Sequence, residues 1–156
     1  MGTEQLWADL QKMKRENEEF LEKYKEEIWK LTDHDGMTPE EFLNREVWLE
    51  IMDRLDRLAY LIGYLDQKVV EEGILSRDSM GRIWLGDRCM RPFEECEIYM
   101  LEEELQQYVW TRSFVCAAAD GSGMYLSGLG RKKKIDGMRA RVRKNEEENG
   151  IAESKN

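Results

Sequence analysis

The chain has 156 residues, of which 37% are charged and 41% hydrophobic, and its formal net charge at pH 7 is −9. This composition excludes an intrinsically disordered protein, and the length allows one or two small domains. No apolar run approaches the roughly 20 residues that cross a bilayer, and the first residues have neither the basic region nor the apolar stretch of a signal peptide. We therefore expect a cytoplasmic protein without a membrane partner.

Charge is segregated along the chain. Residues 1–72 hold ten Lys and Arg against nineteen Asp and Glu, residues 73–130 hold five against nine, and residues 131–156 hold nine against five. An acidic segment repels nucleic acid and attracts basic protein surfaces, whereas a basic segment does the reverse. The two ends of the chain therefore suit partners of opposite charge.

Heptad-like spacing predicts a first helix from about Glu4 to Leu31, with Thr3 as its N-cap. Its apolar positions alternate steps of four and three, as in the seam of a coiled coil. Asn17 falls on that seam, where a polar residue costs stability and can fix register or partner number. The seam consists of Leu6, Leu10, Met13, Phe20, Tyr24, Ile28 and Leu31. The candidate partner-binding residues on the acidic face are Glu18, Glu19, Glu22, Glu26 and Glu27.

A second helix is predicted from Pro39 to about Glu72. Thr38 suits the N-cap, Pro39 the first helical position and Glu41 the third, which together form a capping box. Gly73 suits the C-cap. The apolar stripe of this helix is wider than the first helix needs, so we expect it to contact a second surface, either the rest of the chain or another copy. Residues 1–72 are thus predicted to form a long antiparallel, coiled-coil-like helical hairpin, the acidic arm.

After Gly73 the period changes to two, which predicts five or six short antiparallel strands. Residues 78–81 and 120–123 are typical of hairpin turns. In the last strand an apolar inner face alternates with a cationic outer face formed by Arg139, Arg141 and Arg143. The expected fold class is α+β: the helical hairpin over 1–72, a small antiparallel β-barrel-like sheet over 73–144, and a polar tail over 145–156.

Few residues offer catalytic or metal chemistry. Cys89, Cys96 and Cys116 are odd in number and form no CxxC pair, so we interpret them as small apolar residues in or near a core, in a reducing compartment. His34 is the only histidine, and a catalytic triad or multi-histidine metal site would have to use it.

Three local patterns fail as ligand sites. Residues 33–36 resemble the middle of an EF-hand loop, but Leu31 and Phe42 occupy its first and twelfth ligand positions. Residues 123–128 have the spacing of a phosphate loop, but Leu129 stands where Lys is required. Glu95 and Glu97 share one face of a strand without a partner pair. We therefore expect no enzyme activity, no cofactor and no metal.

The basic segment 131–144 is the best functional signal. Arginines two apart on one strand face are about 6.6 Å apart, close to the spacing of phosphates on a single strand. Aromatic side chains and Arg112 on neighbouring strands offer stacking groups. An alternative is that this strand pairs with the chain's own acidic arm. The candidate nucleic-acid-binding residues are Arg112, Arg131, Lys132, Lys133, Lys134, Arg139, Arg141, Arg143, Trp110 and Tyr125, with Tyr108 as a further stacking group.

The β-rich half resembles a family of short β-rich domains of unknown function that are found mainly in phages and conjugative elements of Firmicutes. The matching residues are Gly81-Arg82, Leu85, Glu97, Trp110-Thr111-Arg112, Asp120-Gly121, Tyr125-Leu126, Gly128-Leu129, Gly137 and Ala140-Arg141-Val142. They span a little under half of the chain. Residues 101–105 look like an insertion, and the helical arm is additional to the minimal domain. The resemblance implies a fold and a mobile-element context in a bacterial host cell.

Two functions of different classes follow. The first is a non-enzymatic, anti-CRISPR-like interaction protein whose acidic arm occupies the cationic channel of a host nucleoprotein complex, with a CRISPR effector as the candidate partner. The second is a DNA- or RNA-binding accessory protein that uses the basic segment. The length and apolar stripes of the arm also allow a homodimer. A third possible function is therefore that of a purely structural oligomerisation module.

Overall fold

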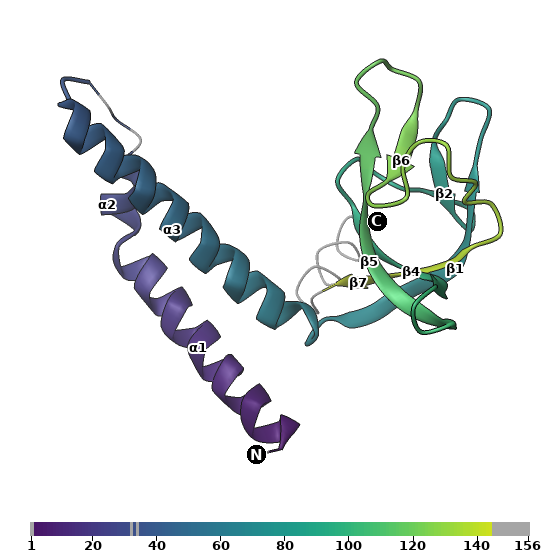
Figure 1. Cartoon of the computed structure of the whole chain (residues 1–156), viewed down its shortest axis with the longest axis horizontal. Coiled ribbons are helices and arrows are strands. Elements are labelled where there is room, and N and C mark those ends of the chain that lie inside the picture. The colour runs from purple at the N-terminus through teal and green to yellow at the C-terminus, as the bar shows by residue number, and fades with distance from the viewer. Residues whose placement is uncertain (1, 32, 34, 145–156) are drawn as a thin grey trace, which may run out of the picture. The chain divides into compact units, whose positions relative to one another are not determined.

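The protein is described by a computed structural model that covers residues 2–31, 33 and 35–144. The chain divides into two compact units, Met1–Asp66 and Gln67–Asn156. The first is helical and the second is built around one sheet, so the predicted α+β class is confirmed (Figure 1). The predicted polar tail 145–156 and His34 lie outside the described residues.

The helical unit holds α1 (Thr3–Lys23), α2 (Lys25–Lys30) and α3 (Pro39–Tyr64). The prediction of one continuous first helix is wrong at Tyr24, whose φ of −104° and ψ of 15° separate α1 from α2. Neither Pro nor Gly marks this break in the sequence. The N-cap is Gly2 rather than the predicted Thr3, and it makes no side-chain capping bond.

The start of α3 is as predicted. The backbone N–H of Glu41 donates to Thr38 Oγ1 at 3.3 Å, and the Thr38 N–H donates to Glu41 Oε2 at 2.8 Å, which completes the capping box. The Thr38 N–H and the Thr38 hydroxyl both donate to the Glu41 carboxylate, and these two hydrogen bonds lower its pKa. The end of α3 differs from the prediction, because the helix stops at Tyr64 rather than near Glu72.

Helix α3 packs on α1 through one face. Gln11 Nε2 donates to Asp66 Oδ2 at 2.7 Å, and the aliphatic part of Lys14 lies against Gly63. Farther along, an apolar groove is lined by Phe20, Tyr24, Glu27, Ile28, Leu31, Trp48 and Met52. No residue of α1 is buried, and the buried residues of α3 are Ala59, Ile62 and Tyr64, with both helices described in full. The coiled-coil-like hairpin stays a prediction.

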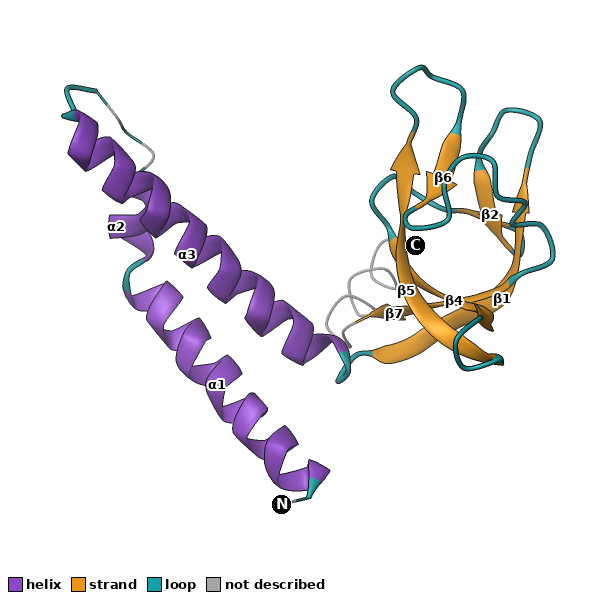
Figure 2. Ribbon diagram, in the orientation of Figure 1, coloured by secondary structure: helices purple, strands orange, loops and turns teal. Residues whose placement is uncertain are grey.

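The sheet unit contains seven antiparallel strands in the described residues (Figure 2). The strands are β1 (Lys68–Arg77), β2 (Ile83–Leu85), β3 (Arg88–Cys89), β4 (Glu95–Glu102), β5 (Gln107–Ala117), β6 (Met124–Leu126) and β7 (Arg139–Lys144). Their order is β3-β2-β1-β7-β4-β5-β6, so the last strand in the chain is central. The predicted barrel is wrong in its closure: no described ladder joins β3 to β6, and the sheet stays open.

Strand β1 replaces the predicted end of the second helix. Val69 and Val70 are β-branched and favour a strand, and β1 pairs with β7 from Lys68↔Lys144 to Ile74↔Arg139. The predicted C-cap, Gly73, instead lies opposite Ala140 in this ladder. Leu85 packs over it, because a Cβ at Gly73 would lie 3.4 Å from Leu85 Cδ1. The pairing partner is distant in the sequence, and local pattern therefore could not reveal this strand.

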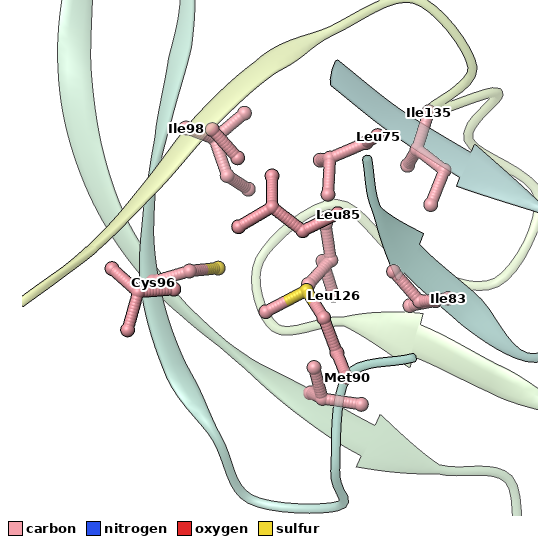
Figure 3. Close-up of a cluster of buried hydrophobic side chains, with 11 residues drawn as sticks. Leu75, Ile83, Leu85, Met90, Cys96, Ile98, Leu126 and Ile135 are labelled. Atoms are coloured by element: carbon pink, nitrogen blue, oxygen red, sulfur yellow. The ribbon is translucent and has the colours of Figure 1, made fainter. Parts of the chain in front are cut away.

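The hydrophobic core lies on the inner face of the curled sheet, where Leu75, Leu85, Ile98 and Leu126 point toward one another (Figure 3). The predicted apolar face of the last strand is confirmed, because Ala140 and Val142 are buried in this cluster. The full cluster is Leu75, Ile83, Leu85, Met90, Cys96, Ile98, Val115, Leu126, Ile135, Ala140 and Val142.

Cys96 lies in the core, as interpreted from the sequence. Burial, together with the negative charges of Glu94, Glu95 and Glu97, raises the pKa of its thiol to about 12. The thiolate is the nucleophilic form of cysteine, so Cys96 is a packing residue at neutral pH.

Two hairpin turns meet at Gly81 and Gly123. The backbone N–H of Met124 donates to Gly81 O at 2.8 Å, and a Cβ on Gly81 would lie 2.8 Å from the Gly123 Cα. Both glycines have positive φ, 76° and 122°. Only glycine lets the two backbones approach so closely, and this contact joins the β1–β2 turn to the β5–β6 turn.

Gly81→Ala is expected to destabilise the sheet unit by about 2–5 kcal/mol, because it adds both positive-φ strain and a backbone clash. Gly86→Ala is the matched control: Gly86 has a φ of 60°, but a Cβ added there would meet no atom within 4 Å, so it should cost only about 1–2 kcal/mol. Urea unfolding of both variants measures the difference. Equal losses of stability in the two variants would contradict the close backbone contact between Gly81 and Gly123.

Candidate functional site

The three arginines on the outer face of β7 are paired within the sheet. Arg141 Nε and Arg143 Nε both donate to the carboxylate of Glu97 on β4, the latter at 2.8 Å. Arg139 donates to Glu72 on β1. The alternative in which the basic strand pairs with the acidic arm is therefore wrong for Arg141 and Arg143, whose partner lies on β4. Arg139 does pair with a residue of the predicted 1–72 arm, but the structure places Glu72 on β1 of the sheet unit and not on a helix. The arginines are also not free to bind a row of phosphates without breaking these pairs.

Glu97 is the charge around which this face is organised. It is only 5% exposed and accepts from two arginines of the adjacent strand. Burial acts to raise its pKa, but the hydrogen bonds and positive charges of Arg141 and Arg143 together outweigh burial and leave the pKa below its ordinary value of 4.5. The carboxylate therefore stays ionised at neutral pH, as a structural counter-ion for β7.

Aromatic rings lie beside these arginines. In the β4–β5 ladder Tyr99 is opposite Trp110, with ring centroids 5.1 Å apart, and Tyr108 lies 5.4 Å from Tyr99. The Arg141 guanidinium lies 4.1 Å from the centroid of the Trp110 ring, and that of Arg139 lies 5.2 Å from the Tyr99 ring. This aromatic–arginine face, formed by Tyr99, Tyr108, Trp110, Arg139 and Arg141, can stack planar groups and hold negative charge nearby.

The other predicted nucleic-acid residues lie elsewhere. Tyr125 on β6 is opposite Cys116, roughly 20 Å along β5 from Trp110 at the usual rise per residue. Arg131 lies near Tyr125 rather than near β7, with its guanidinium 5.7 Å from the Tyr125 centroid. The structure thus splits the predicted set into two groups. Arg112 lies on β5 and contacts Glu95 at 3.7 Å, and Lys132, Lys133 and Lys134 are exposed in the β6–β7 connection.

The predicted acidic residues are all exposed. Glu18, Glu19 and Glu22 lie on α1, and Glu26 and Glu27 lie on α2. Glu18 pairs with Lys14 at 2.9 Å, a surface contact that contributes about 0.3–0.5 kcal/mol. The acidic face therefore remains accessible to a partner.

Helix α3 has a second apolar stripe. Leu43, Val47, Ile51 and Leu61 lie within a quarter-turn of one another at 3.6 residues per turn, and Leu65 follows at the C-cap. Each of the five is between 38% and 61% exposed. Arg54, which pairs with Glu50 at 2.6 Å, interrupts the stripe between Ile51 and Leu61. Trp48 and Met52, which line the groove shared with α1, lie on a different side of the helix. This second stripe agrees with the prediction that α3 has more apolar surface than it needs to pack against α1.

Sequence reasoning missed two residues. Tyr99 follows Glu95 and Glu97 at a spacing of two residues, so the strand alternation places it on the same face as these glutamates. Arg77 gave no such signal, because its surroundings come from the β5–β6 turn, far away in the chain.

Among the described residues no group of three or more His, Cys, Asp or Glu is placed to hold a metal ion. None of the helices described has the length and apolar character to cross a membrane. No protein-family model, curated protein or solved structure matches the chain. The resemblance to the phage and mobile-element family therefore stays an expectation.

Glu97→Gln is expected to destabilise the protein by about 3 kcal/mol at pH 7, because it leaves two half-buried guanidinium groups without their counter-ion. The pKa of Glu97 is lower in the folded state, so its contribution is complete above about pH 4.5 and disappears as the pH falls through the folded pKa. The difference between wild type and variant should therefore shrink below pH 4.5.

Glu104→Gln is the matched control, because Glu104 is an exposed glutamate in the turn that follows β4. It should cost no more than about 0.5 kcal/mol. Urea unfolding from pH 3 to pH 7 tests both variants, and a pH-independent loss for Glu97→Gln would show that the carboxylate charge is not what stabilises β7.

Proposed function

We propose that this chain is a non-enzymatic interaction protein that binds a host protein or nucleoprotein complex through its helical unit. The observation that carries this proposal is the uncovered apolar stripe of α3 beside an exposed acidic surface. Folded proteins rarely expose contiguous apolar patches larger than a few hundred Å² unless the patch is a binding site.

Few residues of the helical unit are buried, and this supports the proposal that the unit binds a partner. α1 buries no residue, and Ala59, Ile62 and Tyr64 are the buried residues of α3, in two helices described in full. The sheet unit, in contrast, has a closely packed core of its own. A partner that covers the α3 stripe removes Val47, Ile51 and Leu61 from water, at about 25 cal/mol per Å² of apolar surface.

Charge narrows the class of partner. Residues 1–66 hold nine Lys and Arg against seventeen Asp and Glu, whereas residues 67–144 hold fourteen against twelve. The helical unit therefore carries the negative charge, and a basic surface complements it. The cationic channel of a nucleic-acid-processing complex is such a surface, and a CRISPR effector in the cytoplasm of a bacterial host remains our candidate, by analogy with the mobile-element resemblance.

The coiled-coil-like hairpin and the homodimer that were expected from the sequence are also proposals. A coiled-coil-like hairpin would present the acidic side of α1 and the apolar stripe of α3 to one partner. A second copy of the chain would compete for the same stripe, and two acidic units would repel each other at low salt. Sedimentation equilibrium of the free protein distinguishes a host partner from a second copy of the chain, because the measured mass rises with protein concentration only if the chain self-associates.

Two arm variants test this function with a guide-loaded, DNA-cleaving CRISPR effector. One replaces Glu18, Glu19, Glu22, Glu26 and Glu27 by Lys, and the other carries Val47→Asp and Ile51→Asp. Each should weaken inhibition of cleavage at least about tenfold, because a tenfold change needs only about 1.4 kcal/mol of binding free energy. Thermal unfolding should remain close to wild type, since the replaced side chains are exposed.

Met80→Asp is the control for adding a charge at an exposed apolar residue, because Met80 is 71% exposed and lies in the sheet unit. It should leave inhibition unchanged. Inhibition that survives both arm variants would contradict binding through the arm, and no inhibition by the wild-type protein would contradict this partner class.

A second function, binding of single-stranded nucleic acid, is favoured by the aromatic–arginine face. Tyr99, Trp110 and Arg141 form a continuous platform on neighbouring strands, and stacking of bases on such rings is tolerant of sequence. The pairing of Arg139 and Arg141 with glutamates reduces the positive charge of this face. The proposed mode is therefore stacking first, with a weaker phosphate contribution than the sequence suggested.

Trp110→Ala is expected to reduce affinity for a labelled oligothymidylate by about tenfold, since loss of one stacking ring costs about 1–3 kcal/mol. Trp110→Phe should retain most of the binding. Tyr125→Ala is the control, because Tyr125 lies on a different part of the sheet. Fluorescence anisotropy at two salt concentrations measures all three variants. A larger loss for Tyr125→Ala than for Trp110→Ala would contradict the assignment of the face.

A further inference from the structure

A small polar pocket lies between the end of β1 and the β5–β6 turn. It has a volume of about 70 Å³. Its polar side chains come from Arg77, the last residue of β1, from Ser122 in the turn, from Tyr125 on β6 and from Arg131 beyond β6. The close contact between Gly81 and Gly123 brings these segments together, so the pocket exists only in the folded sheet unit. Its complete lining is Arg77, Ala118, Ser122, Gly123, Met124, Tyr125 and Arg131.

The Arg77 guanidinium is the unusual group in this pocket. Its Nε and Nη2 atoms are buried and have no hydrogen-bond partner among the described residues. Asp136, the carboxylate that reaches Arg77, accepts instead from the Arg77 backbone N–H at 3.1 Å. Burying a charged donor without an acceptor is costly. By comparison, Arg139 and Arg141 on the same sheet have carboxylate partners.

A second cation stands at the pocket. Arg131 is exposed, lies over the Tyr125 ring at 5.7 Å and donates to Asp120 Oδ2 at 3.0 Å. Asp120 in turn accepts from the Ser122 backbone N–H at 3.0 Å. The Ser122 N–H and Arg131 therefore already engage the nearest carboxylate. The Ser122 side chain also hydrogen-bonds to the Asp120 carboxylate. The polar groups that remain to face a ligand are the donors of Arg77, the hydroxyl of Tyr125 and the outer side of Arg131.

We propose that this pocket binds a tetrahedral oxyanion of the phosphate type. A guanidinium presents two parallel N–H donors to such an anion in a fork geometry, and the two donor atoms of Arg77 without partners supply the charge and the hydrogen bonds. A volume of about 70 Å³ is well above the roughly 10–15 Å³ that a single water needs, so the pocket has room for a group as small as one phosphate. Any larger part of the ligand lies outside the pocket.

The ligand is therefore free phosphate or the phosphate end of a larger molecule. This site is separate from the aromatic–arginine face, because Tyr125 and Trp110 lie on different parts of the sheet. It also uses no residue of the helical unit. Phosphate binding is thus independent of the proposed partner binding, and either can fail without the other.

The experiment titrates the full chain with inorganic phosphate, thymidine 5′-monophosphate, thymidine and acetate at constant ionic strength. Binding is followed by the ¹H–¹⁵N signals of the arginine Nε–H groups and by the shift of the unfolding midpoint. We expect phosphate and the monophosphate to move the Arg77 signal and raise the midpoint, and thymidine and acetate to do neither. Tighter binding of the monophosphate than of phosphate would identify a larger ligand as the source.

Arg77→Gln should weaken phosphate binding at least tenfold, whereas Arg91→Gln, at an exposed arginine outside the pocket, should leave it unchanged. If Arg77→Gln does not fold, Arg131→Gln replaces an exposed side chain and should weaken binding several-fold. Equal binding of phosphate by the wild type and the folded pocket variants would overturn the proposal. An Arg77 signal unmoved by millimolar phosphate, or moved equally by acetate, would overturn it as well.

Discussion

The sheet unit depends on its last strand. β7 lies between β1 and β4, so the ladder between the two halves of the sheet is continuous only when residues 139–144 are in place. One side of β7 supplies Ala140 and Val142 to the core, and the other supplies arginines to Glu72 and Glu97 on the flanking strands. The same six-residue strand thus completes both the apolar interior and the ion pairs of the outer face. Truncation before β7 would remove both at once, and it cannot serve as a simple deletion of a basic surface.

The two units treat charge and apolar surface in opposite ways. In the sheet unit, the buried apolar side chains form one cluster, and most described arginines have carboxylate partners nearby. In the helical unit, the apolar stripe of α3 stays exposed and the acidic side chains of α1 and α2 make few, solvent-exposed pairs. A surface that is both apolar and charged with one sign is suited to a partner of opposite charge with an apolar groove.

The exceptions to charge pairing point to function within the sheet unit. Glu97 shows how the fold neutralises a buried charge, with two arginines on one carboxylate. Arg77 departs from that pattern, because Asp136 accepts from its backbone N–H, and its Nε and Nη2 atoms have no hydrogen-bond partner among the described residues. Arg139 and Arg141 are a third case, because each guanidinium pairs with a glutamate and also lies over an aromatic ring. The Arg77 pocket and the aromatic–arginine face, at different ends of β5, give the sheet two chemically distinct surfaces.

The sequence by itself determined the α+β class, the capping box at Thr38 and Glu41, both hairpin turns and the alternation of β7, because each depends on neighbours within a few residues. It also predicted that the arginines of β7 face outward, and it named Trp110 as a candidate stacking group. Tertiary structure alone decided where the second helix ends, since β1 exists through its pairing with β7, some seventy positions later in the chain. It also decided that the arginines of β7 are paired, that the sheet stays open and that Arg77 lines one pocket with Ser122 and Tyr125. Those outcomes rest on contacts between distant segments, which no local period encodes.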